Sequence, residues 1–266
     1  MAPAPHSIVI TAESKLFAPQ AEKLAQQQGW QWLPKGKPPE QSSVLLLGID
    51  GLQLLPEVDR RKEKPLRVVL SGGPIDPSGA EAWVRGQPLA RAIGIKGART
   101  PSVLDATAGL GEDGWLIARL GCSVTLLERD PVMAALLADG LNRAQLNMET
   151  AEVAKRVTLH HGDALSWFKE NSPSIDVVYL DPMFPHKGKG SLPKRAMQMI
   201  RAQVGEEDNA QALLEAARGV DTSRIVVKRP VKAPLLEGPK PSFQLAGRST
   251  RLDVYLTPRA EEQPHG

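Results

Sequence analysis

Residues Ile175–His186 have the sequence I-D-V-V-Y-L-D-P-M-F-P-H, in which an apolar run ends at an acid, two prolines and an aromatic residue. The run Val177–Leu180 is typical of a strand buried on both faces of a parallel sheet. Prolines cannot continue a strand's hydrogen-bond ladder, so the chain must leave the sheet after Asp181. Open α/β sheets bind ligands at the carboxyl ends of their strands. We therefore expect Asp181 and Phe184 at a ligand-binding edge, although an ordinary strand exit with a helix-capping aspartate fits the same residues.

On both sides of this stretch the sequence alternates between strand and helix patterns. Strands are predicted at Val103–Asp105, Val124–Leu127, Val157–His160, Ile175–Leu180 and Ile225–Lys228, and helices at Trp115–Leu120, Pro131–Asn142, Ala164–Lys169 and Glu206–Arg218. Two late strands, Phe243–Leu245 and Leu252–Leu256, are close enough to form a hairpin. This alternation predicts a doubly wound α/β sheet.

The first part of the chain has a different pattern. Strands are predicted at Ser7–Thr11, Trp30–Trp32, Val44–Asp50 and Leu66–Leu70, with a helix at Phe17–Gln28. These elements indicate a small α+β domain over residues 1–78, followed by the larger domain over residues 79–257, which opens with a helical pattern at Gly79–Gly94. The polar tail, residues 258–266, is expected to be disordered.

Composition narrows the class of protein. The chain has 266 residues, is 41% hydrophobic and carries a net charge of +3 with a pI of about 9, which permits a nucleic-acid partner without requiring one. Its single cysteine, Cys122, fits a reducing compartment. We expect a cytoplasmic protein with no membrane span, and no metal site, because the histidines lack ligand spacing.

A glycine-rich loop follows the first strand of the larger domain. Residues Asp105–Gly114 have the sequence D-A-T-A-G-L-G-E-D-G, and Gly109, Gly111 and Gly114 satisfy G-x-G-x-x-G. With Glu128 at the end of the next strand, this is the dinucleotide fingerprint in outline. A nicotinamide-dependent oxidoreductase is therefore one alternative.

The acids around this loop favour S-adenosylmethionine instead. A carboxylate at Asp105 would repel a pyrophosphate but suits the cofactor's amino group. Glu112 and Asp113 would compete with phosphate for the helix N-terminus, although acids there also simply stabilise a helix. Glu128 can accept hydrogen bonds from both ribose hydroxyls, and Asp163 can accept one from the adenine amine.

Asp181-Pro182-Met183-Phe184 has the form of the [Asp/Asn]-Pro-Pro-[Phe/Tyr] motif of amino-methyltransferases, with Met183 in place of the second proline. A base amine is a poor nucleophile because its lone pair is delocalised. The Asp181 carboxylate and the Pro182 carbonyl can accept hydrogen bonds from the N–H groups of the amine, which localises the lone pair on the nitrogen. Phe184 can stack on the base. The remaining contribution to catalysis is the in-line placement of the amine nitrogen against the methyl group of the cofactor.

A run of basic residues follows the motif. A loop that binds a polyanionic substrate explains this run better than a loop that is only solvated. The residues expected to contact the substrate are His186, Lys187, Lys189, Lys194 and Arg195, together with Lys228 at the end of the next predicted strand.

Five motifs together resemble the RsmJ family, the bacterial small-subunit (16S) ribosomal RNA guanine-N2 methyltransferases. They are G-Q-P-L-A-R-A-I-G-I-K-G at Gly86–Gly97, D-A-T-A-G-L-G at Asp105–Gly111, L-E-R at Leu127–Arg129, V-Y-L-D-P-M-F-P-H-K at Val178–Lys187 and V-V-K-R-P at Val226–Pro230. The resemblance runs from Gly86 to the last strands.

The resemblance implies a seven-stranded, Rossmann-like class I methyltransferase sheet with an antiparallel last strand, and a guanine of 16S RNA or the small subunit as target. It implies S-adenosylmethionine contacts at Glu112, Asp113, Glu128, Arg129, Asp163, Ala164 and Asp181, to which the glycine loop adds Asp105, Ala106, Gly109 and Gly111. Rival interpretations are an amino-methyltransferase for another RNA or DNA base, the oxidoreductase named above, and a non-catalytic RNA-binding module.

Overall fold

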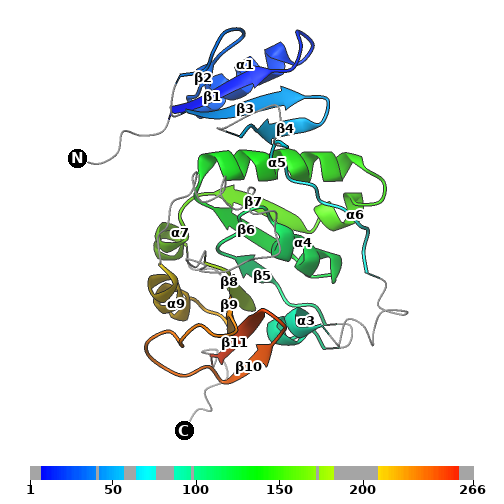
Figure 1. The fold of residues 1–266 in the computed structure, drawn as a ribbon. Helices are drawn as coiled ribbons and strands as arrows, with labels where there is room; N and C mark the ends of the chain where they lie inside the picture. The colour runs from blue at the N-terminus through cyan, green and yellow to red at the C-terminus, as the bar shows by residue number, and fades with distance from the viewer. Residues whose placement is uncertain are drawn as a thin grey trace, which may run out of the picture. The chain divides into compact units, whose positions relative to one another are not determined.

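The computed structural model describes residues 7–39, 42–56, 64–75, 87–96, 99–171, 174–182 and 209–257 (Figure 1). These residues form two compact units. The first contains the described residues up to Val69 together with Ala135–Arg143, and the second contains the rest.

The second unit is built on a seven-stranded sheet with the order β10-β11-β9-β8-β5-β6-β7. Its strands are β5 (Val103–Asp105), β6 (Val124–Glu128), β7 (Val157–His161), β8 (Val177–Leu180), β9 (Arg224–Pro230), β10 (Phe243–Ala246) and β11 (Thr250–Leu256). β11 runs antiparallel to both of its neighbours, and the five strands from β9 to β7 are parallel. The predicted doubly wound sheet with an antiparallel last strand is therefore confirmed. Its strand order reverses between β5 and β8, which is where such sheets bind ligands.

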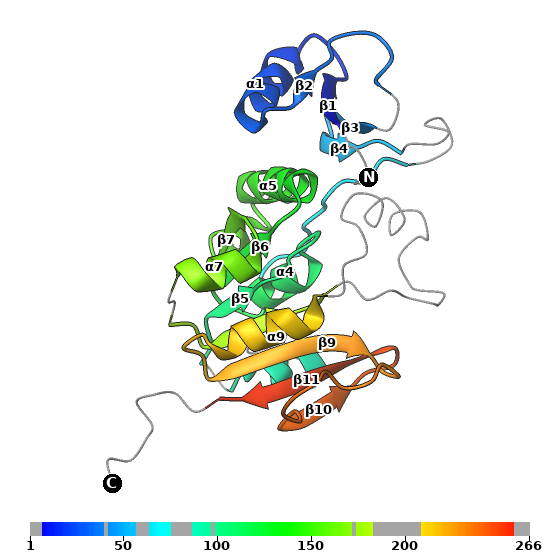
Figure 2. The ribbon, with the colours of Figure 1, turned by 90° about the vertical axis from the view of Figure 1, so that its left-hand side faces the viewer.

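Helices cover both faces of this sheet (Figures 1 and 2). They are α3 (Pro88–Ile93), α4 (Glu112–Arg119), α6 (Ala151–Ala154), α7 (Ala164–Glu170) and α9 (Ala210–Arg218). A further helix, α5 (Pro131–Leu146), follows β6 and is divided between the two units. Figure 2 shows α9 lying along β9, on the same side of the sheet as α7. None of the helices in the described ranges is long and apolar enough to span a membrane.

β8 lies in the middle of this core, as its composition requires. All four residues of Val177–Leu180 are at most 2% exposed. Leu104 of β5, Ile225 of β9 and Leu213 of α9 pack in the same apolar cluster. A strand this apolar is stable only where helices cover both sheet faces, so its sequence fixes its central position.

The first unit contains a smaller sheet with the order β2-β1-β3-β4. Its elements are β1 (Ser7–Ala12), α1 (Ala18–Gln28), β2 (Gln31–Trp32), β3 (Ser42–Gly48) and β4 (Gly51–Leu54). β1 is parallel to both β2 and β3, whereas β3 and β4 form an antiparallel hairpin.

Some predicted boundaries were wrong. Leu66–Leu70 is not a strand: only Leu66 pairs, in an isolated bridge with Leu54. The segment predicted as Val44–Asp50 ends at Gly48, and the chain returns as β4, which was not predicted. Gly51, with φ of 88°, begins this strand.

Two helices are longer than predicted. α4 begins at Glu112 rather than Trp115, because Gly111 takes the left-handed conformation just before it. α5 continues to Leu146. Of the helical pattern Gly79–Gly94, the structure describes only the part that forms α3.

Candidate active site

Asp105 ends β5 beside the point where the strand order reverses. Its side chain is buried, and its Oδ1 accepts a hydrogen bond from the Thr107 N–H at 3.1 Å. Burial raises the pKa of the Asp105 carboxyl to about 8; the Thr107 hydrogen bond opposes this shift, and the carboxylates of Asp113, Asp181 and Glu128 add to it. A buried acid without a cation is a poor arrangement for stability, so this group is suited to a positively charged ligand.

The glycines of the next loop have the backbone conformations that a close ligand approach needs. Gly109 has φ of 54° and Gly111 has φ of 76°, both in the left-handed region that favours glycine. A Cβ on Gly114 would lie 2.4 Å from Cδ2 of Leu126, so this glycine lets α4 pack closely on β6. The loop has the dinucleotide-type geometry that its spacing predicts.

Glu128 is the last residue of β6 and bridges this loop to the start of α5. Its Oε2 accepts the Gly109 N–H at 2.7 Å, and its Oε1 accepts the Asp130 N–H at 2.8 Å. Burial raises the pKa of Glu128, while the two backbone hydrogen bonds lower it. Each carboxylate oxygen keeps a lone pair, so the side chain is fixed in place and can still accept hydroxyl groups.

Asp181 leaves the sheet at the carboxyl end of β8. Its N–H donates to Oγ1 of Thr107 at 2.6 Å, which ties the turn after β8 to the loop after β5. Pro182, the next residue, is buried. The first two residues of the predicted catalytic motif are thus fixed beside the glycine loop.

Lys228 of β9 joins two of the predicted site acids. Its Nζ lies 2.6 Å from Oδ2 of Asp113 and 2.9 Å from Oδ2 of Asp181. The same Asp113 oxygen accepts the Tyr179 hydroxyl at 2.6 Å. α4, β8 and β9 therefore contribute to one hydrogen-bonded network.

Electrostatics explains the protonation of this network. Burial lowers the pKa of Lys228, but the carboxylates of Asp181 and Asp113 outweigh it and raise that pKa above its ordinary value. Burial and the neighbouring acids raise the pKa of the Tyr179 hydroxyl. Lys228 is therefore a cation and Tyr179 a neutral donor at neutral pH.

The remaining predicted cofactor residues lie on the same edge. Asp163 caps α7, with its Oδ1 accepting the Ser166 N–H at 2.9 Å, and Ala164 after it is buried. Arg129 is half-buried after β6, and Glu112 is exposed at the start of α4. Ala106 is buried and donates its N–H to the Tyr179 carbonyl at 3.0 Å.

Several predicted substrate residues cannot be placed. Phe184, His186, Lys187, Lys189, Lys194 and Arg195 lie outside the described residues. Lys228 is placed, but its ammonium pairs with two acids rather than standing free on a basic surface.

The sequence analysis missed Thr107 and Tyr179. Thr107 stands within the glycine motif, and Tyr179 is the one polar residue of the buried run Val177–Leu180, so a hydroxyl in an otherwise apolar strand was the available signal. Within the described ranges, no group of three or more His, Cys, Asp or Glu side chains is arranged to hold a metal ion.

The site's chemistry fits S-adenosylmethionine. Buried Asp105 suits a cation, fixed Glu128 suits a diol, and the loop between them has Gly109 and Gly111 in the left-handed conformation. Acids at the start of α4 make the same helix end unfavourable for a pyrophosphate.

Comparison with known proteins agrees with this chemistry. The family model described as "Putative SAM-dependent methyltransferase" matches residues 27–257. The chain is 53% identical to ribosomal RNA small subunit methyltransferase J of Magnetococcus marinus, over 80% of this chain and 84% of that protein. It is 44% identical to the protein of the same name from Marinobacter nauticus, over 93% and 91%.

A crystal structure of a SAM-dependent methyltransferase from Neisseria gonorrhoeae has the same fold. It matches with a TM-score of 0.68 at 32% identity, over 97% of this chain and all of that one. The chain is therefore an S-adenosylmethionine-dependent enzyme rather than a nicotinamide-dependent one, and it belongs to the methyltransferase family that includes the ribosomal RNA small subunit methyltransferases J.

Proposed function

We propose that this enzyme transfers a methyl group from S-adenosylmethionine to the exocyclic N2 amine of a guanine in 16S ribosomal RNA. The observation that carries the proposal is the position of Asp181-Pro182 at the strand-order reversal, tied to the glycine loop through Thr107. The names of the two relatives, which specify small-subunit ribosomal RNA, support the substrate class.

The cofactor site comprises the predicted residues at the carboxyl edge. Asp105 holds the amino group, Glu128 accepts the ribose hydroxyls, and Asp163 with Ala164 meets the adenine. Ala106, Gly109 and Gly111 shape the loop, while Glu112, Asp113 and Arg129 flank it. When bound, S-adenosylmethionine supplies an electrophilic methyl group.

Asp181 and its neighbours act on the guanine amine. The Asp181 carboxylate accepts one N–H of the amine, and the Pro182 carbonyl accepts the other, so the nitrogen lone pair is directed towards the methyl group. Lys228, 2.9 Å from Asp181, holds the carboxylate in position. Its second partner, Asp113, is held in turn by Tyr179. The rate gain comes mainly from this orientation.

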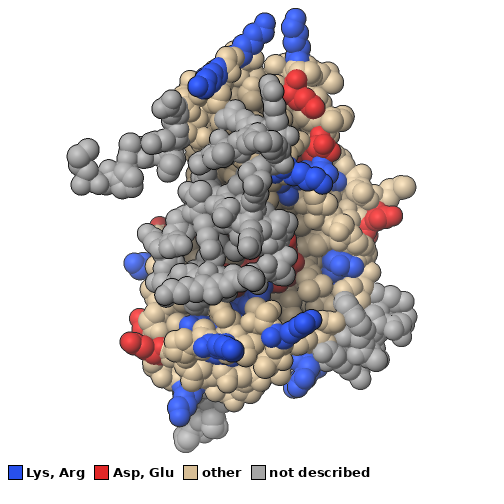
Figure 3. Space-filling model, viewed as in Figure 1, with Lys and Arg blue, Asp and Glu red and all other residues tan. Residues whose placement is uncertain are grey.

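RNA contacts are assigned to Phe184, which stacks on the base, and to the basic residues His186, Lys187, Lys189, Lys194 and Arg195. Lys228 acts on Asp181 instead of on phosphate. Figure 3 shows further lysines and arginines on the lower part of the displayed face, where β10 and β11 lie in Figure 1. A 16S transcript or small subunit is the partner, and the cytoplasm is the expected location.

The domain division remains part of the proposal. Residues 1–78 form a small α+β domain, residues 79–257 carry out the transfer, and residues 258–266 are a tail. The four-stranded sheet within the first of these ranges supports it as a folding unit.

The test is methyl transfer from labelled cofactor to 16S RNA and small subunits from cells lacking the protein, followed by nucleoside mass spectrometry. We expect N2-methylguanosine. A different methylated nucleoside would move the enzyme to another amino-methyltransferase activity. Protein that binds the cofactor yet methylates no RNA form would contradict the proposal.

A further inference from the structure

The segment Val231–Glu237, called the rim segment below, follows β9 directly. It contains no helix or strand. β9 is parallel to β8, so the rim segment begins at the edge of the sheet where Lys228 lies 2.9 Å from Asp181. An irregular segment beside an active site is usually mobile or functional, and here its backbone is held at several points.

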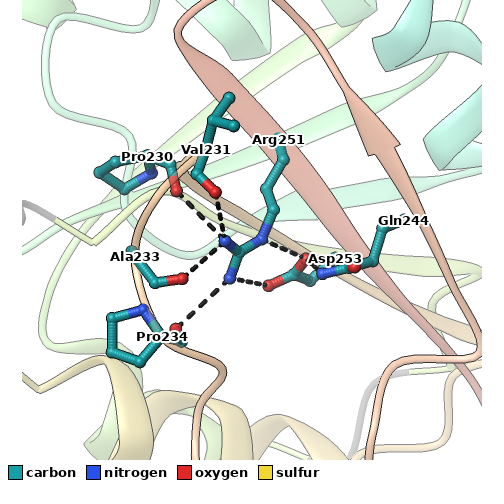
Figure 4. Close-up of polar contacts among 7 residues, drawn as sticks. All are labelled: Pro230, Val231, Ala233, Pro234, Gln244, Arg251 and Asp253. Atoms are coloured by element: carbon teal, nitrogen blue, oxygen red, sulfur yellow. Dashed lines mark hydrogen bonds and ion pairs between the residues drawn. The ribbon is translucent and has the colours of Figure 1, made fainter.

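Arg251, at the start of β11, makes the main attachment (Figure 4). Its buried guanidinium donates from Nη1 to the carbonyls of Val231 at 2.8 Å and Ala233 at 2.6 Å, and more weakly to that of Pro230 at 3.4 Å. Its Nη2 donates to the Pro234 carbonyl at 3.3 Å. One side chain thus holds four backbone carbonyls between Pro230 and Pro234.

The guanidinium is itself held by Asp253. Nε donates to Oδ1 at 2.9 Å and Nη2 to Oδ2 at 3.2 Å, so the pair has the two-point geometry that fixes an arginine plane. Asp253 is 0% exposed, and Gln244 of β10 donates to its Oδ1 at 2.5 Å. Figure 4 shows Asp253 and the four carbonyls on opposite sides of the guanidinium.

Three further attachments hold the rim segment. Gln211 of α9 donates from Nε2 to the Glu237 carbonyl at 3.1 Å and accepts the Glu237 N–H at 2.9 Å. Leu236 packs on the apolar core, and the Val231 N–H donates to the Ser249 carbonyl in the turn between β10 and β11 at 3.1 Å. The rim segment is therefore rigid despite lacking regular structure.

The rigid backbone presents both cations and apolar surface. Lys232 is exposed, as is Arg248 in the adjoining turn between β10 and β11. Val231 is 37% exposed and Leu235 is 43% exposed. Cations beside apolar side chains suit a nucleic-acid strand, whose phosphates and sugar or base faces alternate.

We propose that the rim segment is a preformed RNA-binding surface that contacts the strand flanking the target base, with Arg251 as its positioning residue. This inference rests on the proposed function for the identity of the polyanion. Preforming the surface removes the ordering cost that a flexible loop would add on binding.

The first experiment removes the charges. The double variant Lys232→Ala/Arg248→Ala is compared with Lys155→Ala/Lys169→Ala, which removes two exposed lysines, one just before β7 and one near the end of α7. The probe is a 16S RNA transcript, with the Kd measured by fluorescence anisotropy over a range of salt concentrations. We expect a Kd about five- to twenty-fold higher and a salt slope smaller by about 1.4, as for two single-strand phosphate contacts. The same Kd and slope as the control pair would overturn the inference.

The second experiment releases the backbone without changing the exposed charges. Arg251→Lys keeps the charge but loses the planar guanidinium that binds several carbonyls at once. If this variant does not fold, Gln211→Ala replaces it and removes the attachment at Glu237. We expect KM for RNA to rise several-fold, with kcat and cofactor affinity within two-fold of wild type. Unchanged KM in the folded variant would contradict the positioning role.

The two levels of proposal fail differently. RNA binding that depends on the rim segment, without methyl transfer, would refute the proposed function and leave the inference standing. Methyl transfer by Lys232→Ala/Arg248→Ala with normal RNA affinity would refute the inference and leave the proposed function standing. Wild-type protein with no affinity for the transcript would overturn both.

Discussion

The two sheets of this protein differ most in what their residues bury. Among the described residues of the four-stranded sheet, the buried polar side chains are two serines, Ser42 and Ser43. The seven-stranded sheet and its loops bury charged groups, among them Asp105, Glu128 and Asp253. Both sheets have apolar cores, so stability alone does not require those charges.

The free-energy cost of burying charged side chains indicates which of the two sheets carries the functional site. Burying an acid without a full counter-charge is unfavourable, as the raised pKa of Asp105 shows. Such a group is retained where a ligand completes its environment. In the first unit, by contrast, Arg67 lies 2.5 Å from Asp50 at the surface, where the Asp50 side chain is 60% exposed. Paired substitutions in the two units test this contrast.

The largest effect is expected for Asp181→Ala. Removing the acceptor for the amine should lower kcat by on the order of 10²–10³, as for other oriented hydrogen-bond groups in active sites, while the protein stays folded. The measurement is single-turnover methyl transfer at saturating RNA. Asp50→Ala is the matched control, expected to retain activity. Asp181→Ala activity within a few-fold of wild type would remove this residue from the mechanism.

Asp105→Asn should weaken cofactor binding and increase the free energy of unfolding relative to wild type as the pH rises. Loss of the carboxylate weakens S-adenosylmethionine binding by roughly 10- to 100-fold, the range for a charged hydrogen bond. In the wild type the folded pKa is about 8 and the ordinary value is 3.8, so the folded state holds an extra proton between them. The free energy of unfolding therefore falls as pH rises through this window.

The asparagine variant lacks that fall, so between pH 5 and pH 8 its free energy of unfolding relative to wild type should rise by on the order of 2–4 kcal/mol. Calorimetry of binding and urea unfolding at pH 5 and pH 8 provide the two measurements. Parallel stability curves for wild type and variant across this range would show that Asp105 is ionised without ligand.

Lys228→Met should lower kcat by roughly 10- to 100-fold, since small displacements of a positioned group have effects of this size. Asp113 and Asp181 lose their shared cation, and the Asp181 carboxylate is no longer fixed. Arg67→Met removes the exposed ion pair of the first unit and should change stability by only about 0–1 kcal/mol. If Lys228→Met instead raises KM for RNA and flattens its salt dependence, Lys228 contacts phosphate.

The smallest effect on catalysis is expected for Leu45→Ala in the first unit. Leu45 is 0% exposed, so truncation should cost about 2–5 kcal/mol of stability there. If the first unit folds as a separate domain, cofactor affinity should stay within two-fold of wild type. Differential scanning calorimetry with and without S-adenosylmethionine separates the transitions. A matching loss of cofactor affinity would contradict the proposed domain division.

Sequence patterns predicted the doubly wound sheet because its strands are short, apolar and separated by helices. Where local signals were ambiguous, the predictions failed. Leu66–Leu70 has the composition of a strand, but pairing depends on a partner that lies elsewhere in the chain. β4 was missed because Gly51 marks a turn and begins a strand equally well.

By itself, the sequence predicted the groups of the proposed site: an acid before a glycine loop, an acid at the end of the next strand, and Asp-Pro at the end of an apolar run. These signals are local, because each depends on a few neighbouring residues. Only the tertiary structure decided how the groups combine. Lys228 looked like part of a basic RNA surface, but the register of β9 against β8 sets it between Asp113 and Asp181. The pairing of Lys228 with Asp113 joins residues 115 positions apart in the sequence, so it depends on strand order and register, which no local pattern specifies.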